Sequence, residues 1–167
     1  MRARTRVALA AALFVSLLIT GCALPPKKFG AYPQEASTWR GRLAVRVETA
    51  EPQSFSAAFE LTGSAAAGEM TLFNPLGGTA AVLAWDAQTA IMRVNGDVQH
   101  HPSLDALISR AIGTKIPVDA LFSWLAGELA SADGWNPDLS QRARGRITAK
   151  RTSPAPPVEL RLVLDNE

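Results

Sequence analysis

The sequence predicts an α+β fold in which a curved antiparallel sheet is covered on part of one face by a few short helices. From residue 39 to residue 99, apolar and polar residues alternate, which is typical of half-buried strands. Between residues 104 and 126 the apolar spacing becomes that of amphipathic helices, and alternation returns after residue 145. Strands joined by short turns pair antiparallel, and helices gathered in a separate block indicate an α+β arrangement.

The size and charge of the chain limit what it does. With 167 residues, 47% apolar and 19% charged, it has room for one domain with a packed core and a short appendage. Three of the 17 basic residues, Arg2, Arg4 and Arg6, lie in the predicted signal peptide described below. Without them, 14 basic residues remain beside 15 acidic ones, which gives a net charge of −1. A near-neutral body does not attract nucleic acid, and no nucleic-acid partner is expected.

Residues 1–21 have the pattern of a signal peptide. A basic segment precedes an apolar run at residues 7–19, which is shorter than the roughly 20 residues that span a bilayer. Residues 18–22, Leu-Ile-Thr-Gly-Cys, resemble the lipobox of bacterial lipoproteins. The single cysteine, Cys22, is therefore the predicted lipidation site, and a disulfide framework is excluded. The alternative is an ordinary signal peptide with a chance cysteine. By the same resemblance, Ala23 does not favour retention in the inner membrane, so the expected destination of the protein is the outer membrane.

Residues 22–38 are predicted to be a lipidated N-terminal tether, because they contain three prolines and no apolar periodicity. The domain itself is expected at residues 39–167. Its first strands are expected at residues 42–47, 55–61, 70–72, 82–85, 90–94 and 97–99. Asn95-Gly96 is a strong signal for a two-residue hairpin between the last two of these strands.

Two helices and two further strands follow. The first helix is expected at residues 104–112, with Ser103 as its N-cap, Asp105 in its first turn and Gly113 as its end. Pro117 opens a second helix that stops at Gly127. Strands return at residues 146–151 and 158–164. Two short helices cover only part of a sheet, and the remaining hollow either takes an apolar ligand or is filled by side chains, the commoner outcome.

No catalytic or metal-binding pattern is recognised. The chain has no G-x-S-x-G, S-x-x-K, H-E-x-x-H or nucleotide-binding motif. His100 and His101 are adjacent, so on a strand they point to opposite faces and do not easily share a metal. A solvated strand end is the favoured interpretation of this pair. We expect no metal, no cofactor and no enzyme activity, although scattered Ser, Asp and His side chains could still meet in space.

A cluster of basic residues lies near the C-terminus. Arg142, Arg144, Arg146 and Lys150 share one parity, which predicts the solvated face of a strand. A patch that contacts anionic lipid, including Arg151, is the alternative.

The segment Asn74-Pro75-Leu76-Gly77 fits a type I turn, with Leu76 at its tip. A leucine at the tip of a turn either folds back onto the core, which composition favours, or protrudes as a hydrophobic probe.

Several segments, taken in order, resemble the outer-membrane lipoprotein receptor family LolB. They are Gly41-Arg-Leu-Ala-Val45, the strand at residues 55–61, Leu72-Phe-Asn-Pro-Leu-Gly77, Gly113-Thr-Lys-Ile-Pro-Val118, Leu121-Phe-Ser-Trp-Leu-Ala-Gly127 and Glu159-Leu-Arg-Leu-Val-Leu164. The resemblance covers about residues 39–165, beside the lipobox. The chain departs from the family after Gly127, where it is compact and rich in proline.

The resemblance implies an open, incomplete barrel of antiparallel strands, closed on one side by helices around an apolar cavity. It implies a lipid-anchored receptor that faces the periplasm, accepts lipoproteins from the periplasmic carrier LolA and inserts them into the outer membrane. The loop of Asn74, Pro75, Leu76 and Gly77 would be the membrane-insertion loop. The expected partners are LolA, the acyl chains of client lipoproteins and outer-membrane lipid, with the chain itself a monomer.

The absence of a nucleotide motif predicts transfer down an affinity gradient, without ATP. The candidate acyl-chain cavity residues are Val45, Phe59, Met70, Leu72, Leu121, Trp124 and Leu162, for each of which plain core is the alternative. Two other functions stay open: a structural or interaction lipoprotein with a filled core and no transfer activity, and a hydrolase. A soluble carrier is disfavoured by Cys22.

Overall fold

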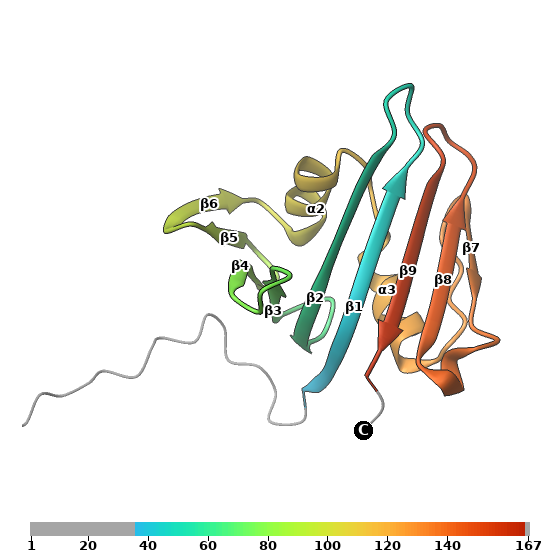
Figure 1. Ribbon diagram of the computed structural model, residues 1–167, viewed down its shortest axis with the longest axis horizontal. Coiled ribbons are helices and arrows are strands. Elements are labelled where there is room, and N and C mark those ends of the chain that lie inside the picture. The colour runs from blue at the N-terminus through green and yellow to red at the C-terminus, as the bar shows by residue number, and fades with distance from the viewer. Residues whose placement is uncertain (1–35, 166–167) are drawn as a thin grey trace, which may run out of the picture.

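The computed structural model describes residues 36–165, and within them nine strands form one antiparallel sheet in the order β6-β5-β4-β3-β2-β1-β9-β8-β7 (Figure 1). The predicted signal peptide and Cys22 lie outside the described residues. The strands are β1 (Ser37–Val47), β2 (Gln53–Gly63), β3 (Gly68–Phe73), β4 (Thr79–Trp85), β5 (Ala90–Val94), β6 (Asp97–His101), β7 (Trp135–Asp138), β8 (Arg146–Arg151) and β9 (Val158–Leu164).

The two longest strands, β1 and β2, pair over their whole length, from Ser37 opposite Gly63 to Val47 opposite Gln53. Ser37 and Thr38, which the sequence places at the end of the predicted tether, belong to β1. Both are exposed, so no apolar alternation marks this start of the strand. Backbone hydrogen bonds between strands do not depend on the type of side chain, so they extend the strand beyond its apolar part.

Gly41 lets β1 and β9 approach closely. Its φ of 154° is rarely adopted by residues with a side chain, and a Cβ atom there would collide with the carbonyl oxygen of Val163. Gly41 pairs with Leu164, the last residue of β9. A larger residue at position 41 would therefore separate the two strands that join the halves of the sheet.

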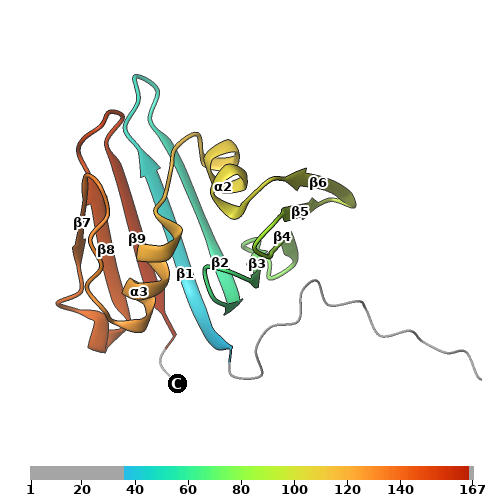
Figure 2. The same cartoon turned by 180° about the vertical axis from the view of Figure 1, so that it is seen from behind.

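Both predicted helices are confirmed with their caps. In α2 (Leu104–Ile112), the Ser103 Oγ accepts a hydrogen bond of 3.1 Å from the Ala106 N–H, and Gly113 ends the helix at a φ of 78°. In α3 (Val118–Ala126), Gly127 ends the helix at a φ of 91°. Figure 2 shows both helices on one face of the curved sheet, with α3 in front of β1 and β9. The predicted α+β fold, an open antiparallel sheet with helices over one face, is confirmed.

The segment after Gly127 differs from the prediction. It contains an additional edge strand, β7, which pairs with β8 although Pro137 lies within it. A proline is tolerated there because it lacks only a donor, and β7 is at the edge of the sheet. The alternating pattern that predicts a strand is absent from Trp-Asn-Pro-Asp, so this strand could not be found from periodicity.

The basic cluster does not lie on one strand face. Residues Arg142–Arg144 form a short 3₁₀ helix, η1, and Arg142 donates from Nε and Nη2 to the Leu125 carbonyl oxygen at 3.0 and 2.7 Å. Arg142 therefore covers the last turn of α3. Arg146 and Lys150 are exposed on the outer face of β8, as predicted. The single parity was misleading because η1 and Gly145 precede β8 and interrupt the two-residue period.

The inner face of the sheet and the helices form one apolar core. Its fully buried large side chains are Trp85, Trp124, Leu61, Leu107, Leu125 and Ile147. Two of these side chains also donate hydrogen bonds of 3.0 Å from their indole N–H to a backbone carbonyl, Trp85 to Ser64 and Trp124 to Ala130. Residues 36–165 thus contain their own sheet, core and helix caps, which is what a domain needs to fold by itself. In the described part of the chain, neither helix is long and apolar enough to cross a membrane.

Candidate functional site

An apolar cavity of about 260 Å³ lies between the inner face of the sheet and the helices. Side chains from β1 to β5, β9, α2, α3 and the α2–α3 connection line it, and every one of them is aliphatic or aromatic. The cavity is close to the lower end of the roughly 300–1,000 Å³ typical of ligand cavities. Such a lining binds by dispersion and by exclusion of water, so it accepts alkyl chains without requiring a particular polar group.

Four of the predicted cavity residues meet at this cavity: Val45, Met70, Leu72 and Leu121. They come from β1, β3 and α3, and the β1–β2 and β2–β3 pairing brings their inner faces together. For the three strand residues, Val45, Met70 and Leu72, the alternation along β1 and β3 predicted a place on the inner face.

The other three predicted cavity residues, Phe59, Trp124 and Leu162, do not line the cavity. Phe59 lies opposite Gly41 and is 3% exposed. Trp124 turns toward β7, where its ring centroid is 6.1 Å from that of Trp135. Leu162 is buried on β9, between β1 and β8. All three fill the core instead, Trp124 as a buried residue of α3 and the other two as buried residues of the sheet.

The apolar face of α2 supplies much of the lining that the sequence reasoning missed. Leu104, Leu107, Ile108, Ala111 and Ile112 all face the cavity, and their helical spacing was the available signal. Phe122 of α3 was also missed. It touches two indoles, with ring centroids 5.7 Å from Trp39 and 6.3 Å from Trp85, and no local sequence pattern indicates these contacts.

The loop between β3 and β4 is a tightly bonded turn with a fully exposed leucine. The Gly77 N–H donates to the Asn74 carbonyl at 2.9 Å, and the Asn74 side-chain Oδ1 accepts 3.0 Å hydrogen bonds from the Leu76 and Gly78 N–H groups. Gly77 adopts a φ of 83°, which favours glycine. Leu76 is 97% exposed. The predicted turn is confirmed, and the interpretation in which Leu76 folds back onto the core is wrong.

This loop is next to the open side of the cavity. β3 pairs with β2 only from Ala58 onward, so residues 53–57 of β2 extend beyond β3. Phe55, in that extension, lines the cavity and is 43% exposed. A second hollow, of about 410 Å³, lies beneath the loop between Asn74 and the extension, and Leu43 lines both spaces. Leu43 is therefore the residue that connects the cavity on the inner face with the hollow beneath the Leu76 loop.

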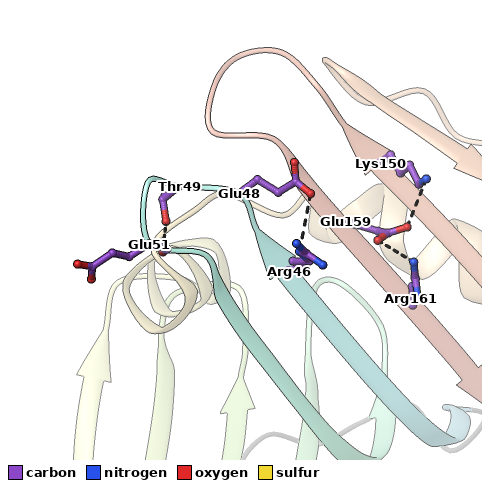
Figure 3. Close-up of polar contacts among 7 residues, drawn as sticks. All are labelled: Arg46, Glu48, Thr49, Glu51, Lys150, Glu159 and Arg161. Atoms are coloured by element: carbon purple, nitrogen blue, oxygen red, sulfur yellow. Dashed lines mark hydrogen bonds and ion pairs between the residues drawn. The ribbon is translucent and has the colours of Figure 1, made fainter.

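Polar groups are organised on the outer face of the sheet rather than at the cavity (Figure 3). Glu159 of β9 lies between Lys150 Nζ at 3.4 Å and Arg161 Nη2 at 2.9 Å. Burial acts to raise the pKa of this carboxyl and is the largest single influence on it. The hydrogen bonds and charges of Arg161 and Lys150 together outweigh burial, and the pKa lies below its ordinary value of 4.5. Among the described residues, no group of three or more His, Cys, Asp or Glu side chains could hold a metal ion.

The lowered pKa of Glu159 predicts a pH-dependent stability. A folded-state pKa below the unfolded one adds stability above the unfolded pKa, and that contribution is lost as the pH falls through the folded pKa. Glu159→Gln is therefore expected to lower the free energy of unfolding by about 1 kcal/mol at pH 7, since both basic partners are largely solvated. Urea unfolding of both proteins at pH 7 and at about pH 3 measures this. A difference that is equally large in acid would contradict the assignment.

The comparisons with known proteins agree with this geometry. The family model described as outer membrane lipoprotein LolB matches residues 36–163, most of the chain. A protein of Bordetella pertussis named outer-membrane lipoprotein LolB is 32% identical, over 91% of this chain and 89% of its own length. Proteins with the same name from Bordetella petrii and Shewanella sediminis are 27% and 29% identical, over 88% and 95% of this chain and 86% and 73% of theirs.

The matched residues include every strand and helix that surrounds the cavity and the Leu76 loop, from β1 to all but the last residue of β9. The match covers the whole folded body rather than one motif, and it includes the segment after Gly127 in which the sequence departs from the family pattern. This chain belongs to the LolB family of outer-membrane lipoproteins.

Proposed function

We propose that this protein receives lipoproteins from the periplasmic carrier LolA, holds their acyl chains in the apolar cavity and delivers them into the outer membrane through the Leu76 loop. As a member of the LolB family, the chain is an outer-membrane lipoprotein. The observation that carries the proposal is a cavity lined by apolar side chains in a domain that also presents a fully exposed leucine. In this proposal, Cys22 carries the lipid anchor and residues after it are the tether.

The energetics favour a sheltered route for an acyl chain. Each methylene removed from water is worth about 0.8 kcal/mol, so a chain with about ten buried methylenes is held by roughly 8 kcal/mol. A lipoprotein therefore does not leave its carrier for water. The lipoprotein moves only when a second apolar surface with a somewhat higher affinity for its acyl chains is presented. The bilayer is the last such surface and has the highest affinity. Such a gradient needs neither a cofactor nor catalysis, and no enzyme activity is part of the proposal.

The cavity also bears on the alternative of a structural lipoprotein with a filled core. Side chains pack the region around Trp124 and Leu162 closely, whereas a cavity of about 260 Å³ lies between α2, α3 and the first five strands. Interiors of proteins are close-packed and cavities cost stability, so a cavity of this size is unusual in a protein with a purely structural core. The void thus supports binding rather than a purely structural role.

A transfer assay tests the proposal. Residues 23–167, without lipid, are mixed with LolA that carries a labelled lipoprotein, and the two proteins are separated. The label is expected to move to residues 23–167. Label that stays on a carrier shown to release it to another acceptor would overturn the proposed function.

Ala111→Trp is expected to reduce this acceptance at least about fivefold, because the indole would occupy the rim of the cavity. Ala111 is itself exposed, so the substitution costs the fold little. Arg110→Trp is the matched control, since Arg110 is the exposed neighbour of Ala111 on α2 and does not line the cavity. Uptake of a fluorescent fatty acid by the three proteins measures the effect. Equal uptake by both variants would exclude the rim at Ala111 as the entrance.

A further inference from the structure

β1 turns three arginines toward the outer face of the sheet, and they differ in their partners. Arg40 is 2.7 Å from Glu60, and Arg46 is 3.7 Å from Glu48. Arg42 is exposed and makes no ion pair of 4 Å or less with the described residues. A guanidinium left without a carboxylate, between two arginines that have one, is available for an anion from outside the protein.

Arg42 lines the hollow beneath the Leu76 loop, together with the polar side chains of Ser56 and Asn74. Asn74 uses its Oδ1 for the two amides of the turn, and its Nδ2 makes none of the hydrogen bonds of the loop. The hollow of about 410 Å³ therefore offers a guanidinium, a hydroxyl and a carboxamide N–H₂ group. All three can donate hydrogen bonds to the oxygens of a phosphate.

The loop projects on the side of the sheet to which Arg42 points. It is drawn in full green in Figure 1 and is faded in Figure 2, where α2 and α3 lie toward the viewer. Arg42, Ser56 and Ala58, which line the hollow, have outer-face parity on β1 and β2, whereas Leu43 and Ala57 beside them have inner-face parity. The loop that carries Leu76 therefore lies on the same side of the sheet as Arg42.

We propose that Arg42, Ser56 and Asn74 form a binding site for the phosphate of an anionic phospholipid headgroup, occupied when Leu76 enters the acyl layer. The site rests on the proposed function, since it assumes that the loop meets the membrane. Apolar side chains that enter a bilayer from its surface reach about 5–10 Å below the headgroups. A tip at that depth leaves the base of its own turn, where Asn74 lies, among the phosphates. An arginine at that level gains a charge-assisted, bidentate contact.

The charge around the hollow favours lipid over a neutral partner. On the outer faces of β2, β1, β9 and β8, the basic side chains are Arg40, Arg42, Arg46, Arg161, Arg146 and Lys150, and the acidic ones are Glu60 and Glu159. A surface with this excess of positive charge is attracted to an anionic leaflet, at about 1 kcal/mol for each basic side chain near it. Arg42 is the member of the set that lies beside the apolar tip.

Vesicle binding by residues 23–167 tests the site. The vesicles are phosphatidylcholine alone or phosphatidylcholine with about a third phosphatidylglycerol, and binding is measured by co-sedimentation at low and high salt. The chain is expected to prefer the anionic vesicles. Arg42→Gln is expected to weaken that binding about fivefold and to weaken binding to phosphatidylcholine less, because the choline of that headgroup offsets the charge of its phosphate. Melting temperatures show that each variant is folded.

Arg144→Gln is the matched control, because Arg144 is an exposed arginine in η1, separated from the loop by β2, β1 and β9. Its binding to anionic vesicles is expected to stay within about twofold of the parent. Equal losses for the two variants would reduce the effect to net charge and overturn the site. Unchanged binding of Arg42→Gln to anionic vesicles would also overturn the site. If that variant also loses affinity for LolA, then the partner of Arg42 is an acidic protein surface.

The same assay separates this inference from the proposed function. Leu76→Glu is expected to bind less to both kinds of vesicle, because it removes the apolar anchor itself. If Leu76→Glu and the parent bind alike, then the loop does not enter membranes and the proposed function fails with the site. If Arg42→Gln binds vesicles like the parent and Leu76→Glu binds less, then the loop still enters membranes and only the phosphate site is overturned.

Discussion

Replacing Leu76 with glutamate is expected to leave the protein folded and able to accept lipoprotein, and to reduce delivery to membranes at least about tenfold. Leu76 is 97% exposed, so the substitution removes no core contact. The turn is held by Asn74 and backbone groups, which the substitution leaves in place. A carboxylate carried into the acyl layer costs about 2.5 kcal/mol or more, which exceeds the roughly 1.4 kcal/mol that corresponds to a tenfold change.

The measurement is the rate at which a labelled lipoprotein passes from preloaded residues 23–167 into vesicles. Leu129→Glu is the control, because Leu129 is also highly exposed, at 79%, but lies in the segment after α3 rather than in the turn. It is expected to deliver at the parental rate. Normal delivery by a folded Leu76→Glu protein would remove the loop from the mechanism, and an equal loss in both variants would show that added negative charge is the cause.

The parts of this fold that the sequence predicts well are those decided by local interactions. Both ends of α2 follow from Ser103 and Gly113, since a cap acts within one turn of its own position. The limits of β8 and β9 follow from strict alternation, because one face of each strand is buried and the other is solvated. The turn at Asn74 is also local, and its hydrogen bonds have the predicted pattern.

The direction in which Leu76 points is not local. The pairing of β3 with β4 shifts between Leu72 and Phe73, directly before the turn. An irregularity of this kind adds twist and redirects the chain that follows, and nothing in Leu-Phe-Asn-Pro indicates it. The sequence therefore predicts the type of turn but not which face of the sheet its tip leaves.

The choice between cavity and core is likewise tertiary. Phe59 and Leu61 share one face of β2, yet only Leu61 lines the cavity. Parity places a side chain on the inner face, whereas the positions of α2 and α3 decide whether it meets a void or another side chain. The same limit explains Arg142 and Arg151. The parity predicts a solvated strand face for Arg142, and only the alternative lipid patch includes Arg151, but both donate hydrogen bonds to backbone carbonyl oxygens of other segments.

Arg151→Ala is the substitution for which we expect the largest loss of stability, about 3 kcal/mol in the free energy of unfolding. Arg151 is 6% exposed on the inner face of β8. Its Nη2 donates to Thr114 Oγ1 at 2.7 Å and to the Pro156 carbonyl at 3.1 Å, and its Nη1 to the Lys115 carbonyl at 3.3 Å. The guanidinium also lies 5.7 Å from the ring centroid of Trp135. Truncation leaves these oxygens without a donor and leaves a cavity.

Urea unfolding measures the loss, and Lys150→Ala is the control. Lys150 is the neighbouring residue on β8, but it points outward and makes only the surface pair with Glu159, so its removal is expected to cost less than about 1 kcal/mol. If both variants lose the same amount, then the buried hydrogen bonds of Arg151 contribute nothing beyond a surface charge.

Arg151→Met separates the hydrogen bonds from the packing. Methionine restores much of the buried volume without a donor, so a purely packing role would return stability close to that of the parent. Replacing a buried ion pair by apolar residues is often neutral, because both charges are removed together. Here the partners of Arg151 are a buried hydroxyl and two carbonyls, which stay behind unpaired. We therefore expect Arg151→Met to remain about 2 kcal/mol less stable than the parent. Because Thr114 and Lys115 directly precede Ile116 and Val118, which line the cavity, the same variant is expected to bind a fluorescent fatty acid more weakly.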